Sequence, residues 1–243
     1  MSQSVPQFFK KHFSFMFPLP LWLRLAGGRV FNRSTVRNYK DRRLFFDKAL
    51  KALSFNGISG DYVEFGCHGG MTFKLAHQSS RRQGQSIKLW GFDSFSGLPD
   101  TEHEEDEHPF WQPGTLATSV DDFHRVCKRN GIPRDDYKIV EGYYENSLPK
   151  FAPNDEPNDI CLAYIDCDLY SSTKAALDFL RPRLKHGMII AFDDYFCWSK
   201  THASGERMAM LEEFSDNDRW SMLPYLNFGW HGMSFIVESK QVG

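Results

Sequence analysis

The stretch YIDCDLYSSTKAALDFLRPRLKHGMIIAFDDY, residues 164–195, decides the fold of this chain. One apolar run closes in Asp166 and Asp168, and a second closes in Asp193 and Asp194. The segment between them has the spacing of one amphipathic helix, which a glycine ends. A strand, a crossover helix and a second strand make a parallel pair. We therefore expect both acidic ends at the same carboxyl edge of one sheet.

Acidic side chains gathered at that edge indicate a metal site. Ligands bind at the carboxyl edge of open α/β sheets. Carboxylates crowded there repel one another unless a cation or a shared proton holds them, and hard divalent cations prefer oxygen ligands. In the alternative interpretation, Asp166 is buried and hydrogen-bonded, while Asp193 and Asp194 cap the loop after their strand.

The rest of the chain alternates between strands and helices, which favours a doubly wound α/β sheet. A long charged loop, residues 100–108, interrupts this alternation with DTEHEEDEH, and we expect it to be solvated or to be ordered by a substrate or partner. The pattern predicts a Rossmann-like, mostly parallel seven-stranded sheet that ends in an antiparallel hairpin. Strands are expected at 62–66, 88–93, 137–142, 160–166, 188–194, 222–226 and 232–239, and helices at 71–81, 120–130, 171–187 and 206–214.

The first 56 residues form a separate unit before the main domain, residues 57–243. An aromatic arm at 12–26 contains two prolines, and it is too short for a transmembrane helix. The arm suits packing on the domain or on a partner subunit; interfacial membrane contact and a cleaved signal are the alternatives. A helix is expected at 38–53 with Leu44, Phe45, Leu50 and Leu53 on one side. This unit is expected to act as a lid or as a homodimer contact.

Composition narrows the classes of partner. The 243 residues carry a net charge of −2, so the chain has no overall basic field for nucleic acid. The five cysteines form no CxxC pair, and we interpret them as reduced thiols of a cytoplasmic protein.

A glycine turn follows the first strand of the main domain. The sequence Glu64-Phe65-Gly66-Cys67-His68-Gly69-Gly70 leads directly into a helix, where glycines allow a tight turn and unpaired N–H groups face a ligand. Asp93 ends the next strand, about 20–30 residues later, where nucleotide-binding folds place an acid for ribose hydroxyls. No lysine of a phosphate-binding loop follows the glycines. The glycine turn and Asp93 together indicate an adenosine-containing cofactor. The alternative is an ordinary turn with an aspartate that caps a helix or turn.

Five motifs together resemble the macrocin O-methyltransferase family. They are VEFGCHGGMTFKLA, LWGFDSFSGLP, VEGYYENSLP, YIDCDLYSSTKAALDFLRPRL and GMIIAFDDY, and they lie within residues 60–195. The resemblance implies S-adenosylmethionine and Mg²⁺ as cofactors. It also implies a small-molecule acceptor, a hydroxyl of a sugar or of a glycosylated natural product.

The resemblance also implies roles for individual residues. Asp166, Asp193 and Asp194 would bind magnesium, and Asp168 would support them. The residues implied for the cofactor are Glu64, Gly66 and Gly69, which would shape its pocket, Asp93 with Ser94 and Phe95 at the ribose, and Gly142 with Tyr143 at the adenine.

The expected mechanism begins with two substrate oxygens on magnesium, one of which loses its proton and attacks the methyl group. Related catechol-type enzymes carry a lysine base where this chain has Leu169. His231, near the last strand, is the candidate that remains for the proton. Two other functions stay open: a metal-dependent glycosyltransferase that uses Asp166 and Asp168 as a DxD motif, and a non-catalytic scaffold of the same fold.

Overall fold

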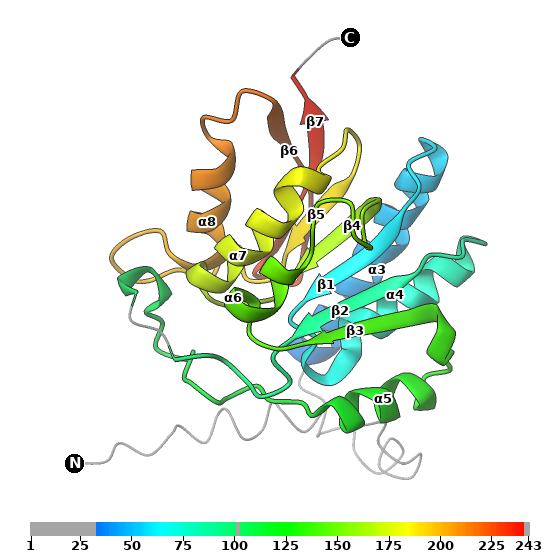
Figure 1. Ribbon diagram of the computed structural model, residues 1–243, viewed down its shortest axis with the longest axis horizontal. Helices are drawn as coiled ribbons and strands as arrows, with labels where there is room; N and C mark the ends of the chain where they lie inside the picture. The colour runs from blue at the N-terminus through cyan, green and yellow to red at the C-terminus, as the bar shows by residue number, and fades with distance from the viewer. Residues whose placement is uncertain (1–32, 101–102, 241–243) are drawn as a thin grey trace.

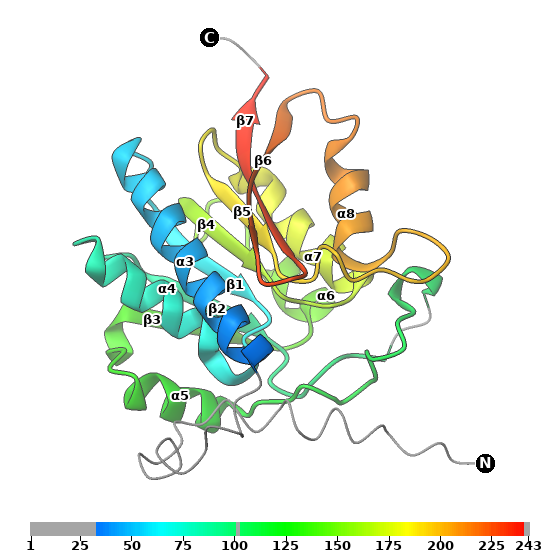
Figure 2. The same cartoon turned by 180° about the vertical axis from the view of Figure 1, so that it is seen from behind.

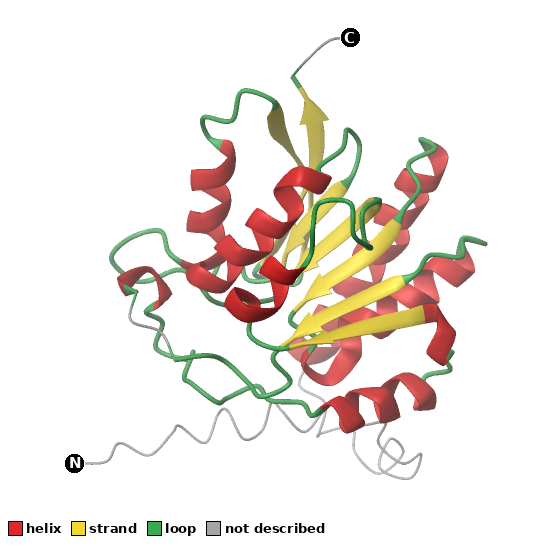
Figure 3. Ribbon diagram, viewed as in Figure 1, coloured by secondary structure: helices red, strands yellow, loops and turns green. Residues whose placement is uncertain are grey.

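The computed structural model describes residues 33–100 and 103–240, and within them a seven-stranded sheet lies between two layers of helices (Figures 1 and 3). The strand order is β3-β2-β1-β4-β5-β7-β6. The strands are β1 (Asp61–Phe65), β2 (Leu89–Asp93), β3 (Tyr137–Glu141), β4 (Ile160–Ile165), β5 (Ile189–Phe192), β6 (Trp220–Phe228) and β7 (Gly232–Ser239). The first five pair in parallel, and β7 runs antiparallel to β5 and β6. The predicted doubly wound sheet with its antiparallel hairpin is confirmed.

The helices divide between the two faces of the sheet (Figure 2). They are α3 (Arg33–Phe55), α4 (Met71–Arg82), α5 (Val120–Arg129), α6 (Tyr144–Ser147), α7 (Tyr170–Leu180) and α8 (Gly205–Phe214). Buried side chains of α3, α4 and α5 share one apolar cluster, and those of α6, α7 and α8 share the other. Right-handed crossovers place helices on both faces in this way.

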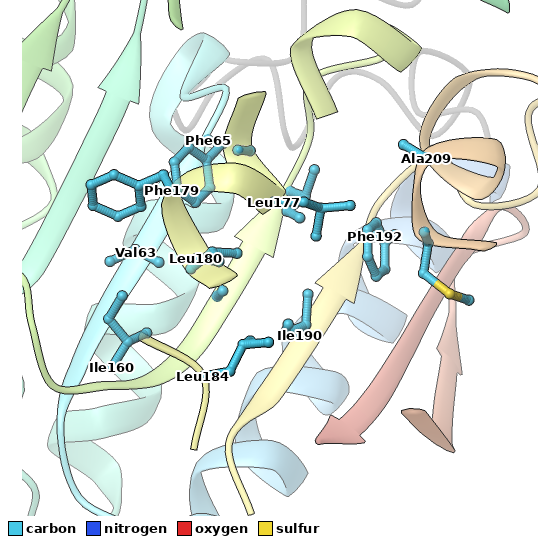
Figure 4. Packing of buried hydrophobic residues seen from close by; sticks show 14 of the residues in the cluster. Val63, Phe65, Ile160, Leu177, Phe179, Leu180, Leu184, Ile190, Phe192 and Ala209 are labelled. Carbon is cyan, nitrogen blue, oxygen red and sulfur yellow. The ribbon is translucent and has the colours of Figure 1, made fainter. Parts of the chain in front are cut away.

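The central strand β4 contributes side chains to both apolar clusters. All six of its residues are buried, as expected for a strand covered on both faces. Ala163 and Ile165 pack toward α7, while Leu162 and Tyr164 pack toward α3. Figure 4 shows the cluster on the α7 side, where Phe65 and Leu177 belong to the same packed group.

Helix α3 differs from its prediction in length and in its buried side. It extends beyond 38–53 at both ends, and Leu44 is 50% exposed whereas Phe46 is fully buried. Phe46 lies one turn before Leu50, so the buried stripe runs through these two positions and leaves Leu44 outside. The arm at 12–26 lies outside the described residues. In the described part of the chain, no helix is both long and apolar enough to cross a membrane.

The crossover from β4 to β5 places the acidic ends side by side. Ile165 pairs with Phe192 at the last rung of the parallel ladder, so the residues that follow both strands emerge together. The spacing of apolar residues predicted one helix across this crossover. The α-helix instead ends at Leu180, and a 3₁₀ turn follows (Arg181–Arg183) because Pro182 cannot continue the α-helical hydrogen bonding.

The charged loop after β2 is only partly solvated. It contains a 3₁₀ turn (Glu104–Asp106), in which Asp106 is buried. The Asp106 carboxylate accepts a 2.9 Å hydrogen bond from the backbone N–H of Ser171, in the first turn of α7. An acid is favourable at a helix N-terminus, and this contact fixes the loop beside the acidic end of β4.

Candidate cofactor and metal site

A cavity of about 990 Å³ lies at the carboxyl ends of β1, β2, β4 and β5. Its wall includes Gly66 after β1, Asp93 at the end of β2, Asp166 after β4 and Asp193 after β5. Helix α3 contributes Arg42 to the same wall. The glycine turn, the ribose-type acid and three acids of the cluster, Asp166, Asp168 and Asp193, were predicted as separate features and share one cavity. Asp194 does not line it.

The glycine turn needs glycine for close approach between two loops. Gly66 has a φ of 90°, and a Cβ at this position would lie 1.8 Å from the backbone oxygen of Asp166. Gly69 also has positive φ, and its N–H donates to Oγ1 of Thr118 at 3.0 Å. Both glycines line the cavity. Gly66 thus allows the loops after β1 and β4 to meet at the cavity wall.

Glu64 lies outside the cavity lining, although the family resemblance places it in the cofactor pocket. Its side chain is fully buried, and it accepts hydrogen bonds from the hydroxyls of Tyr62 and Thr72. Burial raises the pKa of Glu64 to about 8 against these two donors. Because Thr72 lines the cavity, Glu64 supports a residue of the cavity wall through this hydrogen bond.

Stability should therefore depend on pH through Glu64. The folded pKa is about 8 and the ordinary value is 4.5, so the folded state binds the proton more tightly. The stabilisation that the bound proton of Glu64 gives to the folded state is complete below pH 4.5 and is lost as the pH rises through about 8. Glu64→Gln stays neutral at every pH and serves as the reference. Relative to it, the wild type should lose several kcal/mol of unfolding free energy between pH 5 and 9, because each unit of difference between the folded and the ordinary pKa corresponds to about 1.4 kcal/mol. Urea unfolding at several pH values measures this, and a constant difference between the two proteins would contradict it.

Asp93 connects the end of β2 to the glycine turn. Its Oδ2 accepts from the N–H of Cys67 at 2.6 Å, and its Oδ1 accepts from the N–H of Phe95 at 2.6 Å. Burial raises the pKa of Asp93, against the lowering effect of these backbone donors. Each oxygen keeps a second lone pair, so the carboxylate can accept further hydrogen bonds from hydroxyls in the cavity.

Of the other residues expected to bind the cofactor, some line the cavity and others do not. Ser94 and Tyr143 line the cavity, while Phe95 and Gly142 do not. Phe95 is buried, and the centroid of its ring lies 5.7 Å from that of Phe123. The N–H of Gly142 donates to the backbone oxygen of Asp93 at 3.0 Å. Tyr144 also lines the cavity, although it was not among the residues expected to bind the cofactor.

The three expected metal ligands converge. Carboxylate oxygens of Asp166, Asp193 and Asp194 lie within 4.8 Å of one another. Burial, and then the neighbouring Asp193 and Asp194, raise the pKa of Asp166 well above its usual range. Asp168 also lines the cavity, in a left-handed backbone conformation with a φ of 64°, but it lies outside this group of three. An oxygen-only donor set under mutual repulsion fits a hard divalent cation such as Mg²⁺.

Arg42 neutralises part of this charge. Its Nε and one terminal nitrogen donate to Asp193 at 2.9 and 2.5 Å, and the hydroxyl of Tyr164 donates to the same carboxylate. Burial would raise the pKa of Asp193, but the charge of Arg42 and its hydrogen bonds hold it below its ordinary value. Asp193 is therefore an ionised and oriented carboxylate.

His231 lines the cavity with both ring nitrogens in contact with neighbours. Nδ1 lies 2.5 Å from the backbone oxygen of Asp193, where it donates, and Nε2 lies 3.3 Å from a guanidinium nitrogen of Arg42, where it accepts. This tautomer is inferred from the partners. The geometry thus gives His231 a role in holding Asp193 in place.

A second possible ligand group shares Asp194. The Sγ of Cys197 lies 3.3 Å from Oδ1 of Asp194, and Nδ1 of His231 lies 3.4 Å from the same oxygen. Burial and Asp194 raise the pKa of the Cys197 thiol, and Nδ1 of His231 already donates to a backbone oxygen. The three aspartates are therefore the better cation site.

Two buried residues of the site were missed from the sequence. Arg42 carried a signal, since it is a charged residue on the same side of the predicted helix as Phe45 and Phe46. Glu206, fully buried at the start of α8, carried none, because an acid in a first helical turn is ordinary.

The strand order, the glycine turn after β1 and the acid at the end of β2 define a Rossmann-like, class I methyltransferase fold. Two solved structures share this fold. The O-methyltransferase NovP aligns with a TM-score of 0.68 at 21% identity, over 87% of this chain and 90% of its own. The calicheamicin methyltransferase CalS11 aligns with a TM-score of 0.65 at 21% identity, over 97% and 94%.

The chain belongs to the macrocin-O-methyltransferase (TylF) family, whose model matches residues 39–217. It is 29% identical over 176 residues to an 8-demethyl-8-(2,3-dimethoxy-alpha-L-rhamnosyl)-tetracenomycin-C 4'-O-methyltransferase of Streptomyces olivaceus. The aligned residues cover 67% of this chain and 64% of that protein. It is also 26% identical over 175 residues to a mycinamicin III 3''-O-methyltransferase of Micromonospora griseorubida, over 68% of this chain and 67% of that one. The chain thus spans slightly less than two thirds of the first of these relatives.

Proposed function

We propose that the protein is an S-adenosylmethionine-dependent, Mg²⁺-assisted O-methyltransferase that acts on a hydroxyl of a sugar or a glycosylated natural product. One observation carries the proposal: a single cavity joins the glycine turn and Asp93 to Asp166 and Asp193. The names of two curated relatives support a sugar acceptor, since one is a 4'-O-methyltransferase of a rhamnosyl compound and the other a 3''-O-methyltransferase.

The cofactor residues fit S-adenosylmethionine by their hydrogen-bonding capacity. The free lone pairs of Asp93 suit ribose hydroxyls, and the tight turn at Gly66 and Gly69 keeps side chains out of the cavity. Tyr143 and Tyr144 supply an aromatic wall for the adenine. S-adenosylmethionine brings the methyl group on a sulfonium leaving group. The chain therefore has to align the acceptor oxygen with that methyl group and exclude water.

Asp166, Asp193 and Asp194 are the residues that would hold the cation. Bound Mg²⁺ would lower the pKa of a coordinated hydroxyl and hold the developing negative charge. Arg42 and Tyr164 keep the Asp193 carboxylate oriented for this role, while the Asp166 carboxylate accepts no hydrogen bond from the described residues.

The proton-accepting role expected of His231 can be measured. Because Nε2 already accepts from Arg42, we expect His231→Asn, whose amide can retain donation to the Asp193 backbone oxygen, to lower turnover less than tenfold. A general base contributes on the order of 10²–10⁴-fold. A loss in that range would contradict this expectation and assign the proton to His231.

Labelled methyl transfer tests the proposed function. The protein is incubated with methyl-labelled S-adenosylmethionine, Mg²⁺ and a panel of glycosides, catechols and free sugars, with and without EDTA. We expect label on a glycoside hydroxyl that EDTA abolishes, and S-adenosylhomocysteine should raise the melting temperature. The control Asp93→Ala should lose that thermal shift. Stabilisation by a uridine diphosphate sugar would favour the glycosyltransferase, and no response to either ligand would favour the scaffold.

The N-terminal unit belongs to the same proposal. Tyr39 and Arg42 of α3 line the cavity, which supports a lid role for residues 1–56, and we propose a homodimer contact through the arm. All five cysteines are free thiols, which supports a reducing, cytoplasmic location.

A further inference from the structure

The backbone pairing of β4 and β5 ends just where the acidic residues begin. The last bond of this ladder runs from the N–H of Asp193 to the backbone oxygen of Ile165 at 2.8 Å. Beyond it the two chains separate, and the next N–H groups along them, those of Cys167 and Asp194, need other acceptors.

Glu206 accepts from both of these N–H groups. Its Oε1 lies 3.0 Å from the backbone nitrogen of Cys167, and its Oε2 lies 2.9 Å from that of Asp194. The side chain is fully buried. One carboxylate therefore connects the loop that carries Asp166 to the loop that carries Asp194.

The start of α8 is shaped to bring Glu206 to this place. Gly205 has a φ of 57°, and a Cβ there would lie 3.1 Å from the backbone oxygen of Asp168. Glycine thus lets the helix begin against the β4 loop. The side chain at position 206 must accept two hydrogen bonds, one from each loop, and a carboxylate can do so with its two oxygens. A glutamine amide has one acceptor oxygen, and its NH₂ group would face the second backbone N–H without forming a hydrogen bond.

We propose that Glu206 is a positioning residue that sets the spacing of Asp166 and Asp194 for the divalent cation of the proposed function. It joins the two loops just beyond the point where the β4–β5 backbone pairing ends. Supporting groups around metal ligands typically change metal affinity by about 10–100-fold when they are removed. Loss of one of the two anchors should therefore weaken cation binding while leaving the cofactor half of the cavity intact.

Binding titrations with Mn²⁺ and S-adenosylhomocysteine on the full chain test this role. Glu206→Gln should raise the dissociation constant for Mn²⁺ by at least tenfold and change that for S-adenosylhomocysteine by less than threefold. The control is Glu212→Gln on the same helix, which loses contacts to Tyr170 and Lys174 of α7 but touches neither loop. It should bind Mn²⁺ as the wild type does.

The outcomes separate this role from the proposed function. Equal Mn²⁺ affinity in Glu206→Gln and wild type would overturn the positioning role, and so would an equal loss in Glu212→Gln. A wild type that binds S-adenosylhomocysteine but no Mn²⁺ would overturn the cation site itself. If Glu206→Gln does not fold, Glu206→Asp keeps both oxygens on a shorter side chain that cannot reach both loops, and the same weakening is expected of it.

Discussion

Replacement of Asp166 by asparagine is expected to lower methyl transfer by about 10²–10³-fold without loss of stability. A metal that stabilises charge contributes several kcal/mol to the transition state, and each 1.36 kcal/mol is tenfold in rate. Among the residues that the structure describes, none donates a hydrogen bond to the Asp166 carboxylate, whereas Asp193 and Asp194 each accept at least one, so the substitution removes a ligand without breaking such a bond. Because Asp166 repels Asp193 and Asp194, the metal-free variant should melt at or above the wild-type temperature.

The measurement is turnover on the best glycoside acceptor together with thermal melting in EDTA and in Mg²⁺. Asp178→Asn, an exposed acid on α7 that pairs with Arg181, is the matched control and should leave turnover within twofold. Undiminished turnover in Asp166→Asn would remove the aspartate from the metal site. A large fall in melting temperature would show a structural role instead.

Replacement of Arg42 by methionine is expected to lower the free energy of unfolding by about 3–5 kcal/mol, the usual cost of removing one partner of a buried ion pair. Arg42 and Asp193 are both nearly fully buried, and the arginine donates twice to the carboxylate. Without it, Asp193 stays buried beside two other acids. Urea unfolding in EDTA measures the loss without a contribution from bound cation.

Two comparisons make the Arg42 result specific. Arg43→Met, at the next position, removes only a half-exposed pair with Asp47 at 3.9 Å and should cost less than about 1 kcal/mol. The double variant Arg42→Met with Asp193→Asn should recover most of the lost stability, because the unpaired charge is gone. Equal losses from Arg42→Met and Arg43→Met, or strictly additive losses in the double variant, would contradict the charge-pair explanation.

Local patterns allowed most of the sheet to be predicted. The shared carboxyl edge followed from one strand, helix, strand unit, and the parallel pairing of Ile165 with Phe192 places both acidic ends there. The pattern was less reliable where one residue changes the local geometry. Pro182 shortened the crossover helix, and Leu44 fell outside a buried stripe that contains Phe46.

The candidate site was predictable where residues share an edge, and was missed where a contact spans distant segments. Asp93, Asp166 and Asp193 could be placed from strand ends alone. Arg42 reaches Asp193 across 151 positions, and Glu206 reaches the two loops from a helix whose docking no local pattern specifies. Such long-range partners depend on packing.

The most direct test of the central claim is anomalous diffraction from crystals grown with Mn²⁺ and S-adenosylhomocysteine. We expect an anomalous peak among the carboxylates of Asp166, Asp193 and Asp194, with the cofactor ribose on Asp93 in the same cavity. A cofactor bound away from Asp93, or a fully occupied cofactor with no manganese at the three aspartates, would contradict it.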